Sequence, residues 1–182
     1  MRRYIGTTDE PLCPEGIRLM ENRKYPDVEM VFTSPLKRCR ETAAFLYPGQ
    51  EATVIPNLAE CDFGEFENKN AKELSDNPKY QAWIDSGGMI PFPGGESREA
   101  FIRRSVDGFL EAVDICREKG VTCASFVVHG GTIMSIMSAF APQDGDYYFW
   151  QCKNAEGFEL NLCEKQDQEE GLTCTGWRKV VK

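Results

Sequence analysis

The fold is decided by Ser125-Phe126-Val127-Val128-His129-Gly130-Gly131-Thr132, a stretch that holds the only histidine of the chain. The residues from Val121 to Val128 form a short apolar run rich in β-branched side chains, bounded by glycines on both sides. Such a run predicts a buried strand of a parallel sheet that is covered on both faces. Beyond it, apolar side chains recur at helical spacing and predict a helix from Thr132 onward: Ile133, Ile136, Met137 and Phe140.

His129 is therefore expected at the C-terminal end of a strand, where open α/β sheets bind their ligands. Gly130 and Gly131 let backbone N–H groups approach an anion at the N-terminus of the following helix. An imidazole beside such amides suits a phosphate group. A histidine that only hydrogen-bonds to its neighbours at a strand end fits the stretch equally well. The stretch alone leaves both interpretations open.

The rest of the chain alternates predicted helices and strands. Periodicity and start signals predict helices at about 14–23, 34–46, 71–86 and 97–119. Ser34 is expected to cap the second of these helices, with Pro35 in its first turn. Short apolar or alternating runs predict strands at about 28–32, 52–55, 158–163 and 172–181, and residues 144–146 predict a turn. The helix at 97–119 has the clearest apolar stripe: Ile102, Val106, Phe109, Val113 and Cys116.

Composition and order together predict one α/β domain over residues 1–182. The chain has no internal repeat or linker, and 182 residues suit a single core. Alternating elements predict a three-layer α/β/α architecture, in which a mostly parallel sheet is flanked by helices. The net charge of −8 argues against nucleic acid or an anionic membrane as the main partner.

The cysteines predict free thiols rather than a metal site. None of the eight has C-x-x-C spacing, and one histidine cannot complete a Cys/His cluster, so no zinc site is expected. Met1-Arg2-Arg3 is followed by polar residues, and no apolar run has membrane length. We therefore expect a cytoplasmic protein with reduced thiols.

Two further segments carry candidate chemistry. The first turn of the helix expected after Pro35 holds Lys37 and Arg38, although cations at that position oppose the helix dipole. That conflict favours an anion-binding role, although solvated surface charge explains at least one of the cations there. Residues 57–67 hold four carboxylates among Phe63 and Phe66. A carboxyl group among aromatic rings can have its pKa raised and act as a general acid, whereas most of these acids are expected to face water.

Four segments, in this order, resemble motifs of the histidine phosphatase superfamily, which has the phosphoglycerate-mutase-like fold. Arg3–Gly16 is similar to its G-R-x-x-G-x-x-D-x-P-L-x-x-x-G segment. Ser34–Ala43 resembles S-x-L-x-R-A-x-x-T-A. Leu58–Asn68 resembles L-x-E-x-x-F-G-x-W-E-G, with Phe66 in place of the tryptophan and Asn68 in place of the last glycine. Val128–Gly131 is similar to the closing V-S-H-G-G.

Within the superfamily, the residues between these motifs most resemble alpha-ribazole phosphatase and the small broad-specificity phosphatases. The matching residues are Tyr80, Trp83, Pro93-Gly94-Gly95-Glu96-Ser97, Phe101 and Arg104. Phosphoglycerate mutases carry a longer stretch before their second histidine, which disfavours a mutase.

The resemblance implies a role for each matching residue. Arg38 would hold the phosphoryl oxygens, His129 would donate to them, and the Gly130 amide would add a backbone donor. Gly6 belongs to the same implied phosphate-binding set. Glu60 would protonate the leaving alkoxide and then activate the water that attacks a phosphohistidine. No metal and no cofactor are implied.

The chain departs from the family at its start. In the family the nucleophile is the histidine of an Arg-His-Gly triplet that ends the first strand. This sequence begins inside the segment that follows the triplet, and it holds no second histidine. We therefore expect an N-terminally truncated domain without the first strand, and a phosphatase impaired in this chain.

The expected function is hydrolysis of a small phosphorylated metabolite, such as an alpha-ribazole-5'-phosphate-like compound or a sugar phosphate, through a phosphohistidine. One alternative is a catalytically inactive phosphate-binding or regulatory module. A phosphoglycerate-mutase-type phosphotransferase is a lesser alternative. A metal-dependent hydrolase on the acidic loop is disfavoured, because one histidine and one carboxylate cluster offer no second metal-binding element. The sequence predicts no oligomeric state.

Overall fold

The computed structural model describes residues 3–141, 147–164 and 171–180. The turn expected at 144–146 lies outside these residues. The elements of the described chain, in order, are α1 (Pro14–Glu21), β1 (Met30–Thr33), α2 (Lys37–Leu46), β2 (Thr53–Val54), the 3-10 helices η1 (Pro56–Leu58) and η2 (Gly64–Phe66), α3 (Pro78–Asp85), α4 (Arg98–Lys119), β3 (Ala124–Val127), α5 (Gly130–Phe140), the 3-10 helix η3 (Tyr147–Trp150), β4 (Gly157–Glu164) and β5 (Leu172–Val180).

The expected parallel sheet is present. Its strand order is β2-β1-β3, and both neighbours of β1 run parallel to it. Phe32 in the central strand pairs with Thr53 on one side and Phe126 on the other. The last two strands, β4 and β5, form a separate antiparallel hairpin. The fold class predicted from the sequence is therefore confirmed. Antiparallel pairing occurs in the C-terminal hairpin and in an isolated bridge between Arg3 and Asn70.

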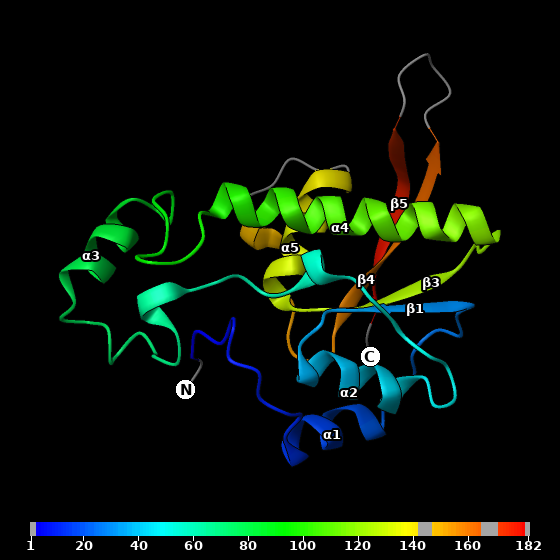
Figure 1. Cartoon of the computed structure of the whole chain (residues 1–182), viewed down its shortest axis with the longest axis horizontal. Coiled ribbons are helices and arrows are strands. Elements are labelled where there is room, and N and C mark those ends of the chain that lie inside the picture. Colours follow the sequence, from blue (N-terminus) through cyan, green and yellow to red (C-terminus); the bar gives the residue numbers. More distant parts are fainter. Residues whose placement is uncertain (1–2, 142–146, 165–170, 181–182) are drawn as a thin grey trace.

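The sheet is the middle of three layers (Figure 1). Helices α1 and α2 cover one face, and α4 and α5 cover the other. Adjacent residues of β1 show why, because successive side chains of a strand point to opposite faces. Val31 packs in a cluster with Cys39 and Ala43 of α2, whereas Phe32 packs in a cluster with helices α4 and α5. Both faces are therefore apolar and both are covered.

The buried face of helix α4 is shifted from the expected stripe, although Val113 and Cys116 of that stripe pack against the core. Its buried residues are Phe101, Ser105, Gly108, Phe109 and Ala112, so only Phe109 of the expected set is fully buried. Small side chains permit this packing. A Cβ atom added to Gly108 would lie 2.8 Å from Cβ of Asn57, so η1 approaches α4 at a distance that only glycine allows. A prediction from the spacing of apolar residues cannot identify small or polar residues that are buried in this way.

Helix α2 also begins differently from the prediction. It starts at Lys37, and its N-cap residue Leu36 contributes no side-chain hydrogen bond. Ser34 is not the cap but lies fully buried two residues earlier, where its hydroxyl accepts from the Leu36 amide at 3.3 Å. The Lys37 amide instead donates to Asp9 Oδ1 at 2.6 Å. A carboxylate from a distant segment therefore offsets the cations of the first turn.

The segment between about 61 and 96 extends beyond the sheet, where it carries α3 (Figure 1). An aromatic cluster holds it together and joins it to the start of α4: its buried members are Cys61, Phe66, Leu74, Tyr80, Phe92 and Phe101. Tyr80 lies on the buried side of α3. The extension therefore has its own small core against the Glu60 loop.

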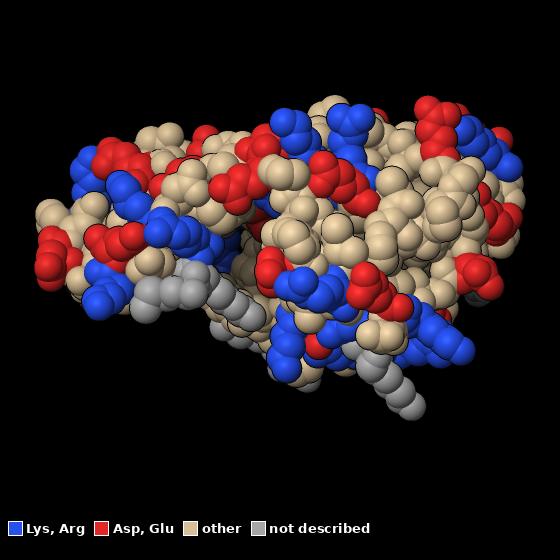
Figure 2. All heavy atoms as spheres, turned by 90° about the horizontal axis from the view of Figure 1, so that it is seen from below, with Lys and Arg blue, Asp and Glu red and all other residues tan. Residues whose placement is uncertain are grey.

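The structure shows how the charged side chains are distributed and how apolar the helices are. On the face seen in Figure 2, acidic and basic side chains are interspersed rather than gathered by sign. In the described part of the chain, no helix combines the length and the apolar character needed to cross a membrane.

Candidate active site

His129 lies at the carboxyl edge of the sheet and forms the N-cap of α5. Its side chain is buried, with 7% exposure. The Arg38 Nε–H donates to Nδ1 of the imidazole at 3.3 Å, so Nδ1 is an acceptor. The proton of the neutral ring therefore sits on Nε2, which lies 2.7 Å from the Ser34 hydroxyl oxygen and donates to it. Burial, followed by the nearby Arg38 and Arg104 charges, lowers the pKa of His129 to about 3.

Arg38 lies in the first turn of α2 and reaches into the N-terminal segment. Its guanidinium donates to three backbone carbonyls of that segment: Thr8 at 2.7 Å, Gly6 at 3.0 Å and Ile5 at 3.3 Å. Together with the bond to His129, these contacts fix the plane of the guanidinium group. The structure therefore brings Arg38 and His129 together, as the sequence predicts for a phosphate site.

The N-terminal segment is held in turn by Glu67. One carboxylate oxygen, Oε1, accepts from the amides of Gly6 at 2.8 Å and Thr8 at 2.9 Å. The Thr8 hydroxyl donates to the same oxygen at 2.7 Å. Gly6 also packs tightly, because a Cβ atom there would lie 1.9 Å from the Cys61 carbonyl oxygen. The structure thus places Gly6 beside Arg38, with its amide bonded to Glu67.

Glu60 follows η1 and points at the start of α5. Its Oε1 accepts from the Cys61 amide at 2.9 Å, and its Oε2 accepts from the Gly131 amide at 3.2 Å. A carboxylate at this end of a helix is favourably placed relative to the helix dipole. Burial raises the pKa of Glu60, while the two amide donors and the Arg38 and Arg104 charges oppose that rise. Glu60 is therefore a carboxyl group with raised proton affinity, bonded to an amide two residues along the chain from His129.

Gly130 leaves open space at the first turn of α5. A Cβ atom added to Gly130 would meet nothing within 4 Å, whereas one added to Gly131 would lie 2.4 Å from Glu60 Oε1. The two glycines differ in what surrounds them: Gly131 packs against the carboxylate, and Gly130 faces open space. The predicted residues Arg38, His129, Gly130 and Glu60 thus gather around one helix N-terminus.

Sequence reasoning missed the role of Ser34 and much of the role of Tyr147. Tyr147 in η3 donates to the Gly131 carbonyl at 3.2 Å, and burial raises its pKa to about 12. The Arg98 guanidinium lies 4.4 Å from the centre of the Tyr147 ring. Tyr147 belongs to a cluster of four consecutive aromatic residues, Tyr147–Trp150, in which Trp150 is fully buried while Tyr148 and Phe149 are exposed. The cluster is a recognisable signal, but only the tertiary structure shows which ring meets the site.

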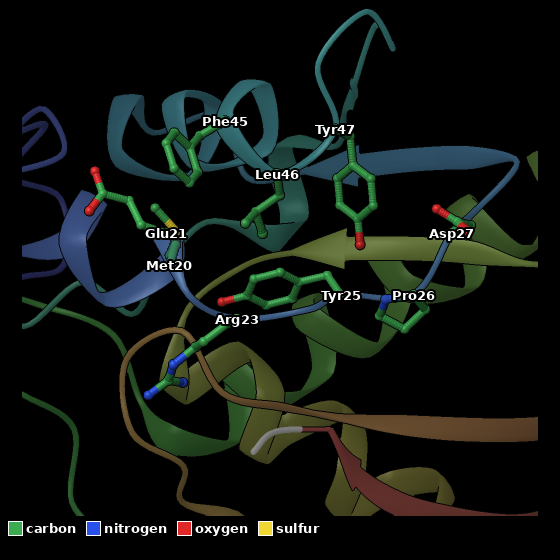
Figure 3. Close-up of a pocket in the computed structure, with 9 residues that line it drawn as sticks. All are labelled: Met20, Glu21, Arg23, Tyr25, Pro26, Asp27, Phe45, Leu46 and Tyr47. Atoms are coloured by element: carbon green, nitrogen blue, oxygen red, sulfur yellow. The ribbon is translucent and has the colours of Figure 1, made fainter.

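A cavity of about 220 Å³ lies away from these residues, between α1 and the C-terminal end of α2 (Figure 3). It is lined by Met20, Glu21, Arg23, Tyr25, Pro26, Asp27, Phe45, Leu46 and Tyr47. None of the predicted site residues lines it. Among the residues described by the structure, no group of three or more Asp, Glu, His and Cys side chains is arranged to hold a metal ion.

Comparisons with known proteins agree with this geometry. The family model of the histidine phosphatase superfamily (branch 1) matches residues 1–174. The alpha-ribazole phosphatase from Shigella flexneri has a TM-score of 0.71 and 20% identity, over 94% of this chain and 86% of that one, which shows a common fold. The phosphoglycerate mutase from Thermus thermophilus has a TM-score of 0.57 and 30% identity, over 78% of this chain and 76% of that one. No curated protein sequence matches the chain.

Proposed function

The chain belongs to the histidine phosphatase superfamily, and on that premise we propose that it hydrolyses phosphate monoesters of small metabolites. The observation that carries the proposal is the meeting of Arg38, His129 and Glu60 at the N-terminus of α5. Two of these groups suit a phosphoryl dianion, and the third suits the proton transfer that releases an alcohol. Such catalysis consists mainly of positioning and charge stabilisation.

Arg38 and the first turn of α5 are proposed to bind the phosphoryl oxygens. The guanidinium is planar and forms paired hydrogen bonds with oxyanions, and the open space beside Gly130 is where an oxyanion would approach the helix. Binding requires Arg38 to exchange its carbonyl partners in the N-terminal segment, and its bond to His129 Nδ1, for phosphate oxygens. The incoming negative charge would raise the pKa of His129, so that the imidazole takes up a proton and donates to the phosphoryl group.

Glu60 is proposed to be the general acid and then the general base. Burial raises the pKa of Glu60 and so favours its protonated form, which can pass a proton to the leaving alkoxide oxygen. The resulting carboxylate then takes a proton from the water that attacks phosphorus. In the first step the phosphoryl group passes from the ester oxygen to an attacking imidazole, and in the second it passes from that imidazole to water.

A phosphohistidine intermediate requires a second imidazole. The 182 residues hold one histidine, and His129 is assigned here to phosphate binding. We propose that the attacking imidazole comes from a residue outside this sequence. In its absence no phosphohistidine forms, so this chain is proposed to bind phosphate but to be impaired in hydrolysis.

The test compares the 182-residue chain with a protein that adds the residues its gene encodes in frame upstream, wherever such residues exist. Both are assayed for p-nitrophenyl phosphate hydrolysis in the presence of EDTA, and for an acid-labile phosphoenzyme. Hydrolysis with a phosphoenzyme in the longer protein, abolished by Glu60→Gln, supports the proposal. A longer protein that contains an additional histidine, yet shows neither hydrolysis nor a phosphoenzyme, contradicts it.

A phosphate-binding module is a second candidate, which the single, fully hydrogen-bonded histidine favours. Calorimetric titration of this chain with inorganic phosphate and sugar phosphates separates the candidates. Binding without turnover in any preparation supports the module. Phosphoryl transfer between phosphoglycerates, assayed in parallel, would instead support the mutase alternative.

A further inference from the structure

Arg104 of α4 and Glu96 form an ion pair beside the Glu60 loop. The Arg104 Nε–H donates to Glu96 Oε1 at 2.7 Å, and Nη2 donates to Oε2 at 2.9 Å. Both side chains are largely buried, with 25% and 17% exposure. A two-point contact of this kind fixes the orientation of the guanidinium as well as its position.

The remaining donors of Arg104 are directed at the backbone on either side of Glu60. Nη1 donates to the carbonyls of Asn57 at 3.0 Å and Ala59 at 2.8 Å, and Nη2 donates to the carbonyl of Glu60 at 2.9 Å. A guanidinium group has five N–H bonds. With the two bonds to Glu96, all five are used.

This arrangement determines where the Glu60 side chain points. The Ala59 carbonyl belongs to the peptide before the Glu60 Cα, and the Glu60 carbonyl belongs to the peptide after it. Holding both peptides restricts the two backbone dihedrals of Glu60 and hence the direction of its Cα–Cβ bond. The carboxyl group is then positioned to accept from the Cys61 and Gly131 amides.

Glu96 connects the same loop to the segment before α4. Its amide donates to the Asp62 carbonyl at 2.9 Å, and its Oε2 accepts from the Asp62 amide at 3.3 Å. The contact is close, since a Cβ atom on the preceding Gly95 would lie 2.4 Å from the Asp62 carbonyl oxygen. Glu96 therefore contacts the chain just after Glu60, next to the two peptides that Arg104 holds.

We propose that Arg104 and Glu96 are positioning residues for Glu60: they hold the peptides on both sides of Glu60 so that its carboxyl group lies at the N-terminus of α5. The proposal rests on the proposed function only for the proton-transfer role of Glu60. Arg104 also contributes positive charge, which opposes the rise in the Glu60 pKa caused by burial. Its removal should therefore both loosen the loop and raise that pKa further.

Three variants separate positioning from charge. Arg104→Met removes both the donors and the charge. Arg104→Lys keeps the charge, but an ammonium has three donors and cannot reach Glu96 and three carbonyls together. Glu96→Gln keeps Arg104 but removes the charged partner that orients it. Arg103→Met is the matched control, because Arg103 is the adjacent residue on α4 and is exposed.

The first measurement is amide hydrogen exchange at Cys61 and Gly131, whose N–H groups bind the Glu60 carboxylate. We expect exchange at least about fivefold faster in Arg104→Met and in Arg104→Lys, a smaller increase in Glu96→Gln, and none in Arg103→Met. The Ile133 amide, which donates to the His129 carbonyl within the same helix, is expected to keep its rate. Unchanged exchange at Cys61 and Gly131 in the Arg104 variants overturns the proposal. So does acceleration spread equally to Ile133, because that would indicate a general structural role.

The second measurement is the carboxyl ¹³C titration of Glu60, assigned with Glu60→Gln. Arg104→Met is expected to raise the titration midpoint, and Arg104→Lys is expected to raise it by less. If Arg104→Met does not fold, Arg104→Lys and Glu96→Gln still decide the outcome through exchange. Neither measurement needs turnover. If the chain hydrolyses no monoester, the proposed function is contradicted, but the test of the positioning role is unaffected.

Discussion

The imidazole of His129 and the hydroxyl of Ser34 lie 2.7 Å apart at the carboxyl edge of the sheet. The two residues follow β3 and β1, which are paired in parallel, and the Ser34 amide donates to the Val127 carbonyl at 3.3 Å. Pairing of these strands therefore turns the imidazole toward the protein interior. The ring is neutral, with one nitrogen donating to Ser34 and the other accepting from Arg38.

Replacing Ser34 with alanine should destabilise the protein by about 1–3 kcal/mol, because the buried Nε2–H of His129 loses its acceptor. Ser34 is fully buried, so water does not readily substitute. Urea unfolding monitored by circular dichroism measures the change. Ser138→Ala, at an exposed position of α5, is the control and should shift the free energy of unfolding by less than about 0.5 kcal/mol. Equal effects of the two substitutions would falsify the assignment of the Ser34–His129 bond.

His129 should make the protein less stable as the pH falls below 6.5. Its pKa is about 3 when folded and 6.5 in the reference state, so between these values the unfolded chain binds the extra proton. The contribution of His129 to stability is fully present above pH 6.5, and as the pH falls below this value it is lost at up to about 1.4 kcal/mol per pH unit. The contribution of His129 is isolated by comparing the free energy of unfolding of the unsubstituted protein with that of His129→Gln at about pH 7, 6 and 5. The ring proton resonances of His129 should also stay unshifted between about pH 5 and 8. A midpoint inside that range contradicts the burial argument.

Gly6→Ala should be far more damaging than Gly130→Ala, although both glycines are predicted phosphate-site residues. The added methyl group at Gly6 would meet the Cys61 carbonyl oxygen at 1.9 Å, and backbone must move to admit it. We expect a loss of about 2 kcal/mol or more in thermal or urea unfolding. Gly130 has open space and lies in a helix, where alanine is favoured, so its substitution should leave stability unchanged or slightly higher. Any effect of Gly130→Ala should appear instead in phosphate binding.

Glu60→Gln should reduce kcat by about 10²–10⁴-fold in any preparation that hydrolyses phosphate monoesters, because glutamine cannot transfer the proton. KM and phosphate binding should change little. Glu65→Gln is the matched control from the same acidic loop: Glu65 is exposed and pairs with Lys79 at 2.6 Å. Steady-state kinetics across about pH 5 to 8 measures both variants. If Glu65→Gln lowers kcat as much as Glu60→Gln, the assignment of the general acid to Glu60 is wrong.

The order of helices and strands could be predicted from the sequence because it depends on residues that are close to one another along the chain. The apolar run before His129 and the helical spacing after Gly131 determined β3 and α5. Ser97 and Gly120 marked the ends of α4, where the Ser97 hydroxyl accepts from the Ala100 amide and Gly120 adopts a left-handed conformation. These signals act within a few residues, so they survive without knowledge of the rest of the chain.

Only the tertiary structure decided which residues form hydrogen bonds with one another in the candidate site. Ser34 is a helix cap by local rules, but strand pairing buries it against His129, 95 residues away. Arg104 lies 44 residues from Glu60 and binds its carbonyl only because small residues let α4 pack closely on η1. The sequence by itself singled out the candidates for phosphate chemistry: Arg38, Glu60 and His129. Their hydrogen-bond partners, and hence their protonation states, follow from burial and from contacts between distant segments, which no local pattern contains.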